Sequence, residues 1–77
     1  MNSGLFFKRH IFMIQLGGGE HWRRAERIIK KAESTGAKVV DYNVKDGVCT
    51  VILESSDEAF RSIVRNAQEM GTVRVLM

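Results

Sequence analysis

Apolar and polar positions follow two different periods along this chain, and the periods predict strands and helices in turn. The run His10–Leu16 is short and almost wholly apolar, as in a buried strand. From Glu20 to Ser34 the apolar residues recur every three or four positions, which is typical of a helix with one apolar face. We expect Trp22 to anchor this helix in the core and Gly36 to end it in the left-handed conformation.

The middle of the chain carries the clearest turn signal. Two β-favouring runs flank Asp46-Gly47, a dipeptide that suits a two-residue type I′ hairpin turn. Because strand side chains alternate between faces, this turn predicts which residues lie together on one face. The predicted cross-strand pairs are Val44 with Cys49, Tyr42 with Val51, and Val40 with Leu53.

A second helix and a last strand complete the pattern. Ser55 and Glu58 have the spacing of a capping box, in which two side chains satisfy backbone N–H groups at a helix start. An apolar stripe follows from Ala59 to Met70, and we expect Gly71 to end the helix. The closing segment TVRVLM has the composition of a strand.

The predicted order β-α-β-β-α-β is that of an α+β, ferredoxin-like sandwich, a four-stranded antiparallel sheet with two helices on one face. We place this single domain at residues 10–77, after an N-terminal extension of residues 1–9. The other face of such a sheet has no helix over it, and apolar residues on adjacent strands there predict an interface. We expect a homo-oligomer, a dimer or larger, held by this open face or by the edge strands of the sheet. The first strand adds to the open face either Phe12 and Ile14 or Ile11 and Met13, depending on which way it faces. The interface residues that we expect are Phe12, Val48, Thr50, Ile52 and Arg74.

Length and composition support self-association. A core in a chain of 77 residues contributes only roughly 3–5 kcal/mol, and Cys49 is the single cysteine, so no intrachain disulfide can add to it. Two histidines and one cysteine, far apart in sequence, do not predict a metal site, and no motif calls for a cofactor. The net charge of +3 permits nucleic-acid or phosphate partners without requiring them.

The N-terminal residues do not have the order of a secretory signal. Lys8 and Arg9 follow the first apolar residues, whereas a signal places its charges before the apolar core. No stretch approaches the roughly 20 apolar residues that span a bilayer, so we expect no membrane contact. The sequence thus predicts a cytoplasmic protein.

Three consecutive glycines precede the first helix, and they lack the spacing of a P-loop or of a dinucleotide-binding loop. A strand-to-helix corner and a small-ligand loop both fit, because N–H groups at a helix start can hold an anion. His21 suits a packed position as well as a ligand contact. The ligand-binding candidates are Gly17, Gly18, Gly19, Glu20 and His21.

The polar face of the first helix is strongly basic. Glu20, Glu26 and Glu33 border it, which fits an ordinary solvated face, but the repeat also suits contacts with successive phosphates. The nucleic-acid-binding candidates are Arg23, Arg24, Arg27, Lys30 and Lys31. The chain has no serine–histidine–acid set and no Cys-x-x-Cys motif, so we expect a non-enzyme.

The segment TGAKVVDYNV, with Gly36 just ahead of the second strand, resembles the corresponding part of ACT domains, and the likeness covers nearly the whole chain. Lys38 stands where an asparagine is usual, and the first loop lacks the usual proline-glycine. The resemblance implies a regulatory module that acts as a dimer or larger and binds a small effector near the first loop.

A weaker resemblance links IFMIQL and DGVCTVIL to the two signature strands of the RNA-recognition motif, with Phe12 at the first aromatic position. Val48 and Thr50 stand where that family has base-stacking aromatic residues. Stacking contributes roughly 1–3 kcal/mol per base, so we do not expect this surface to bind RNA in that way. Our main hypothesis is a non-enzymatic, effector-binding homo-oligomer, and the alternative is a nucleic-acid-binding protein that uses its first helix.

Overall fold

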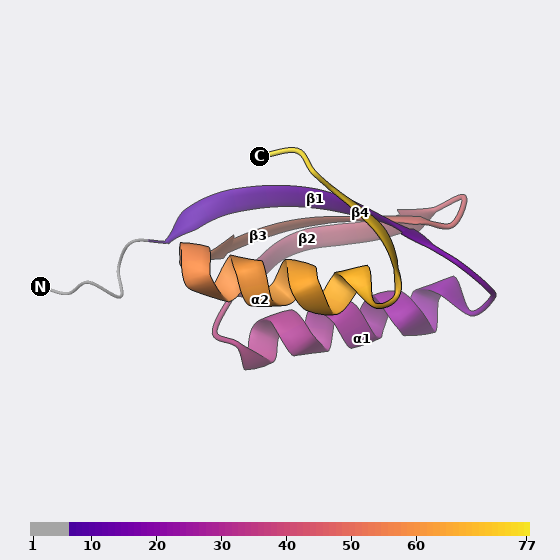
Figure 1. Ribbon diagram of the computed structural model, residues 1–77, viewed down its shortest axis with the longest axis horizontal. Helices are drawn as coiled ribbons and strands as arrows, with labels where there is room; N and C mark the ends of the chain where they lie inside the picture. The colour runs from indigo at the N-terminus through magenta and orange to yellow at the C-terminus, as the bar shows by residue number, and fades with distance from the viewer. Residues whose placement is uncertain (1–6) are drawn as a thin grey trace, which may run out of the picture.

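The computed structural model describes residues 7–77, and its elements follow the predicted order (Figure 1). Residues 1–6 of the predicted N-terminal extension lie outside the described residues. The elements are β1 (Lys8–Leu16), α1 (His21–Ser34), β2 (Lys38–Lys45), β3 (Val48–Ser55), α2 (Asp57–Gln68) and β4 (Gly71–Val75). The strands form one antiparallel sheet in the order β2-β3-β1-β4, and both helices cover the same face. The ferredoxin-like fold is therefore confirmed.

The core lies between the sheet and the two helices. Its largest fully buried side chains include Phe12 and Ile14 of β1, Leu53 of β3, Ile28 of α1 and Ile63 of α2. Each such side chain stabilises the fold by roughly 1.5–3 kcal/mol through the apolar surface it removes from water. The two central strands thus meet both helices in one continuous core.

Helix α1 buries the predicted apolar face, except at its first turn. Ala25, Ile28, Ile29 and Ala32 are buried, whereas Trp22 is 57% exposed. The prediction that Trp22 anchors the core is wrong, because its side chain lies outside the buried stripe of α1, beside Tyr42 of β2 with ring centroids 6.4 Å apart in an edge-on arrangement.

The C-terminus of α1 has the predicted glycine stop. Gly36 has a φ of 96°, in the left-handed region that glycine adopts without steric cost. Its N–H donates to the carbonyl of Glu33, and the N–H of Ala37 donates to the carbonyl of Ala32, which together make a Schellman motif.

The central hairpin has the predicted turn but not the whole predicted register. Asp46 and Gly47 both have positive φ, at 54° and 78°, as a type I′ turn requires. Near the turn, Val44 pairs with Cys49 and Tyr42 with Val51, as expected. The third predicted pair is wrong. A β-bulge between Val39 and Asp41 shifts the register by one residue, so that Val39 pairs with Leu53 and Val40 is 43% exposed.

The start of α2 differs from the predicted capping box. Ser56 is the N-cap, and its hydroxyl accepts a hydrogen bond from the N–H of Ala59 at 3.1 Å. Ser55 is instead the last, fully buried residue of β3, and its hydroxyl donates to the carbonyl of Ser56. The strand continues one residue further than the pattern suggested, so the cap moves by one.

Gly71 does not end α2, which stops at Gln68, but begins β4. A Cβ placed on Gly71 would overlap the backbone carbonyl of Gln15 on β1, so only glycine permits this close approach. Beyond Val75 the ladder continues through a β-bulge, because the N–H groups of Leu76 and Met77 both donate to the carbonyl of Ile11.

The first strand faces the opposite way from the predicted interface, and it begins at Lys8, two residues before the predicted start. Phe12 is fully buried on the helix-covered side of the sheet, so it cannot belong to an interface on the open face. Ile11 and Met13 point to the open face instead, opposite Ile52 and Thr50 of β3. The position of Gln15 could have revealed this orientation. Residues two apart in a strand share a face, and Gln15 is polar and exposed, so Ile11 and Met13 are expected on its face.

Candidate functional site

The loop between β1 and α1 holds its backbone in a rare conformation. Gly18 and Glu20 have φ values of 71° and 58°, both in the left-handed region, and Glu20 is the N-cap of α1. A non-glycine residue in this conformation costs on the order of 1 kcal/mol and is most often kept at functional sites. The Glu20 carboxylate makes no capping hydrogen bond to the helix and pairs with Arg23 at 3.1 Å. Among the residues that the structure describes, no side chain caps the first N–H groups of α1.

His21 holds this loop in place. Its Nε2 donates a hydrogen bond to the carbonyl of Gly18 at 2.9 Å, which leaves Nδ1 as the only ring nitrogen open to another contact. The ring also packs against the hairpin turn, since a Cβ on Gly47 would lie 3.3 Å from the Cε1 atom of His21. The N–H of Leu16 donates to the carbonyl of Gly47 from the same end of the sheet. These contacts give His21 a packed, structural position.

The glycine loop and the basic helix meet in one concavity, which joins two of the residue sets that the sequence suggested separately. It is a hollow of about 360 Å³, within the usual size range of small-ligand sites. It brings three guanidinium groups together with one carboxylate, so its net charge is positive. The lining residues are Gly19, Glu20, Arg23, Arg24 and Arg27.

Arg24 is the most constrained of these arginines. It is half-buried, and its Nη2 donates to the carbonyl of Met70 at 3.0 Å, which ties α1 to the turn before β4. Its Nε is buried without a hydrogen-bond partner among the described residues. Arg27, in contrast, is exposed, and none of the ion pairs in the described part of the chain involves it. One guanidinium is thus fixed in place and another is available to a ligand.

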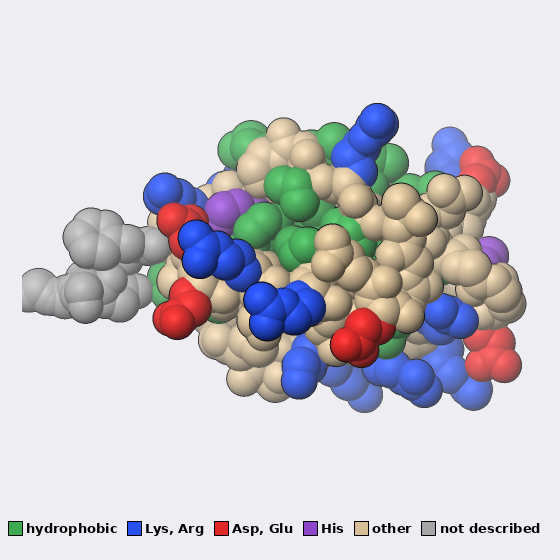
Figure 2. Space-filling model, in the orientation of Figure 1, with side chains coloured by type: hydrophobic (Ala, Val, Ile, Leu, Met, Phe, Trp, Pro, Cys, Tyr) green, Lys and Arg blue, Asp and Glu red, His purple; other side chains and the backbone are tan. Residues whose placement is uncertain are grey.

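The basic surface of α1 extends beyond the concavity to Lys30 and Lys31. Arg23, Arg27, Lys30 and Lys31 are exposed, and Figure 2 shows Lys and Arg side chains gathered along the edge of the molecule formed by α1. Arg24 is less accessible than these four residues, because it is half-buried and its guanidinium donates a hydrogen bond to the carbonyl of Met70.

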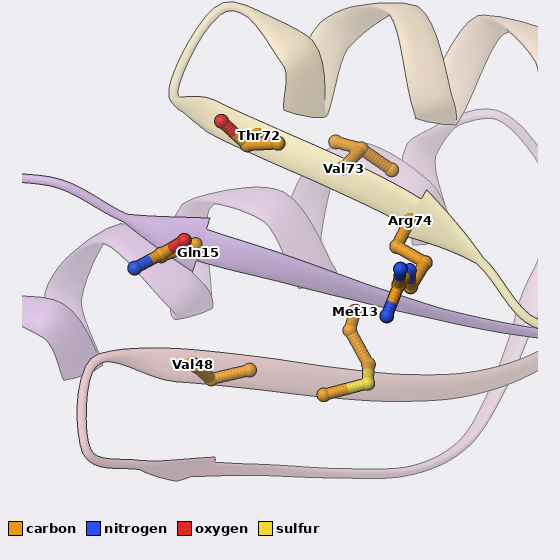
Figure 3. A pocket seen from close by; sticks show the side chains of 6 residues that line it. All are labelled: Met13, Gln15, Val48, Thr72, Val73 and Arg74. Atoms are coloured by element: carbon orange, nitrogen blue, oxygen red, sulfur yellow. The ribbon is translucent and has the colours of Figure 1, made fainter.

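The open sheet face carries most of the predicted interface residues. Val48, Thr50 and Ile52 of β3 lie there, and all three are half-buried by their neighbours. Figure 3 shows a shallow groove on this face, in which Met13 reaches from β1 toward Val48 while Arg74 stands beside it on β4. This face presents no aromatic side chain from β1, β3 or β4, so the stacking platform of an RNA-recognition motif is absent from these strands.

A second apolar surface, which the sequence did not predict, lies between α2 and β4. A groove of about 330 Å³ runs there, and Figure 2 shows hydrophobic side chains gathered beside α2 with basic ones on the helix. Val75 lines this groove, Leu76 and Met77 follow along the same sheet edge, and each of the three is at least half exposed. The lining residues are Phe60, Arg61, Val64, Arg65, Gln68 and Val75. The sequence contained one indication of this surface, the pair Arg61 and Arg65 beside the apolar stripe of the helix. The same pattern also fits an ordinary solvated helix face.

His10 closes one end of this groove. Its ring stacks on Phe60 with centroids 3.9 Å apart and an angle of 5° between the ring planes. Its Nε2 lies 3.7 Å from a carboxylate oxygen of Asp57, and its Nδ1 lies 3.4 Å from the carbonyl of Met77. His10 therefore connects β1, the start of α2 and the end of the chain.

The chemistry of the other reactive groups is limited. Cys49 is fully buried, and burial raises the pKa of its thiol to about 11, which disfavours the nucleophilic thiolate. Among the described residues, no three His, Cys, Asp or Glu side chains are grouped so that they could hold a metal ion. None of the helices in the part of the chain that the structure describes is long and apolar enough to cross a bilayer.

Comparison with known proteins identifies no relative: no protein-family model matches the chain, and no curated protein is significantly similar to it. The likeness to ACT domains therefore stays a prediction from the sequence.

Proposed function

We propose that this protein is a non-enzymatic regulatory module that binds a small anionic effector and self-associates, in the manner that its resemblance to ACT domains implies. The observation that carries the proposal is the concavity in which the glycine loop meets Arg23, Arg24 and Arg27. Guanidinium groups bind carboxylates and phosphates through paired, charge-assisted hydrogen bonds. The uncapped start of α1 adds backbone N–H groups and the positive end of the helix dipole at the same place.

Binding assays with small anions test this proposal. Isothermal titration with inorganic phosphate, a dicarboxylate and a nucleoside triphosphate should detect at least one ligand. Replacing Arg27 by Gln removes a charged hydrogen bond and should weaken that ligand by about tenfold or more. Lys30→Gln is the matched control, because it removes one positive charge from α1 outside the concavity. Equal losses in both variants, or no binding by any anion in the wild type, would contradict the proposed site.

Nucleic-acid binding is the second candidate function, and the four exposed basic residues along α1 support it. A protein that neutralises several phosphates loses affinity steeply as salt rises, whereas a compact arginine site for a small anion should respond less. Reversing Arg23, Arg27 and Lys30 to Glu should abolish a gel shift with mixed DNA and RNA while leaving the melting temperature nearly unchanged. A gel shift that survives the triple reversal would return this helix face to an ordinary solvated role.

A further inference from the structure

The end of the chain, at and just after β4, carries a group of exposed apolar side chains along one edge of the sheet. Val75, Leu76 and Met77 are 50%, 53% and 59% exposed. Val75 lies beside the α2 groove, whereas Leu76 and Met77 follow on the open-face side of the same edge, opposite Ile11. Farther in on the open face, Ile11 and Met13 are half-buried. Contiguous exposed apolar surface beside a groove is typical of a protein interface.

The backbone of β4 is also open to a further strand. β4 lies at one end of the strand order, and β1 is its only partner among the described strands. Strand edges that must stay unpaired are usually protected by bulges and charged residues. Between Gly71 and Val75 the ladder is regular, with Arg74 as its single charged residue, and the bulge at Leu76 and Met77 lies beyond this stretch. This edge can therefore accept another strand.

The charges of α2 favour a second copy of the same helix in the opposite direction. Asp57 and Glu58 lie in its first turn, while Arg61 and Arg65 follow toward its end. Glu58, Arg61 and Arg65 are exposed and are spaced by three and four residues, so they lie on one stripe of the helix. Two antiparallel copies would place the acidic turn of each helix beside the basic residues of the other, which lowers the cost of bringing like surfaces together.

We infer that a second copy of this chain docks on the α2–β4 face, with β4 antiparallel to β4 and α2 antiparallel to α2. One two-fold axis perpendicular to the sheet satisfies both pairings, since α2 packs over the β4 side of the sheet. The result is a continuous eight-stranded sheet with the helices on one face. This inference rests on the self-association in the proposed function, and it names the surface that performs it.

Light scattering after size exclusion tests the surface with two matched variants. Val75→Lys places a charge in the proposed interface, and Val40→Lys makes the same change at the opposite sheet edge, where the valine is similarly exposed. At about 100 µM the wild type should have twice the monomer mass of 8.7 kDa, and Val75→Lys should raise the dimer dissociation constant by about tenfold or more. Val40→Lys should leave the dimer intact.

The single tryptophan provides an independent readout. Trp22 lies on α1 beside β2, away from the α2–β4 face, so its emission should not change when the dimer is diluted to monomer. A red shift on dilution, together with dissociation of Val40→Lys, would place the interface at the β2 edge and overturn the inference. Dissociation by Ile52→Lys alone would place it on the open face and overturn the inference as well.

A charge exchange tests the helix pairing even if Val75→Lys fails to fold. Arg65→Glu should weaken the dimer, and adding Glu58→Arg should restore at least part of the affinity, because the exchanged charges again lie opposite each other. A double variant that is as weak as Arg65→Glu overturns the antiparallel α2 pairing. If the wild type is monomeric at about 100 µM, self-association is wrong. The effector site is tested separately by the anion titrations, so its outcome does not depend on that result.

Discussion

Both edges of the sheet expose apolar side chains, but the two edges differ in the regularity and the charge of their strands. At the β2 edge, a bulge interrupts the ladder beside Val40, and the side chain of Asp41 accepts a hydrogen bond from the N–H of Tyr42 at 2.8 Å. Lys38 and Lys45 add charges at the two ends of this strand. At the β4 edge the ladder is regular from Gly71 to Val75, a bulge follows only at Leu76 and Met77, and an apolar groove lies beside the regular stretch. Exposed apolar surface therefore favours association only where the strand next to it is also free to pair.

The largest difference in stability should be between Phe60 on α2, which covers the β4 side of the sheet, and Trp22 on α1, beside β2. Phe60 is 9% exposed and contacts His10 and Phe12, whereas Trp22 is 57% exposed. Phe60→Ala should lower the free energy of unfolding by about 3–5 kcal/mol, and Trp22→Ala by less than about 1 kcal/mol. Chemical denaturation of both variants at a concentration where the wild type is monomeric checks this. Equal losses would mean that the α1 side is packed more tightly than its exposure indicates.

Gly71 should be the least replaceable glycine, because it sets how closely β4 approaches β1. Gly71→Ala forces a Cβ onto the carbonyl of Gln15, and we expect a loss of about 2–3 kcal/mol as β4 is displaced. Gly17→Ala is the control, since its Cβ would have no neighbour within 4 Å, and it should change stability by no more than about 0.5 kcal/mol. Denaturant melts give the two values. If the dimer uses the β4 edge, Gly71→Ala should also weaken association, and unimpaired dimers would argue against that edge.

Cys49 reports on the centre of the sheet, between the two edges. Its raised pKa means that the folded state keeps the proton that the unfolded state releases, so the contribution to stability is intact below about pH 9 and is lost as the pH rises toward 11. The wild type should lose roughly 1–2 kcal/mol more than Cys49→Ala across this range. Thermal melts from pH 8 to 11 measure the difference, and identical pH profiles for the two proteins would contradict the shifted pKa.

The exposed ion pairs should distinguish the two sides least. Lys8 pairs with Asp57 at 3.5 Å beside α2, and Arg23 pairs with Glu20 at 3.1 Å beside α1, and all four side chains are more than half exposed. Lys8→Gln and Arg23→Gln should each change the free energy of unfolding by no more than about 0.5 kcal/mol. A larger loss in either variant, measured in denaturant at 0.15 M salt, would show that the ion pair contributes more to the free energy of unfolding than exposed pairs usually do.

The sequence alone was sufficient for the order of the elements and for most of the core, because these depend on local signals. The helical period, the Asp46-Gly47 turn and the Gly36 stop each reflect the preferences of a few neighbouring residues. The glycine loop and the basic helix were also identified as candidates from local composition. Their union in one concavity was not, because it depends on where the β1–α1 turn directs the first two turns of the helix.

Only the tertiary structure decided the features that depend on distant neighbours. The direction of Phe12, the bulge at Val40 and the exposure of Trp22 follow from which side of the sheet the helices cover and how far α1 extends along it. Gly71 illustrates the same point, since its requirement comes from Gln15, far away in sequence and adjacent only across the β1–β4 ladder. The difference between the two sheet edges also depends on tertiary structure. The sequence of a strand does not show whether its neighbour in the sheet is another strand or water.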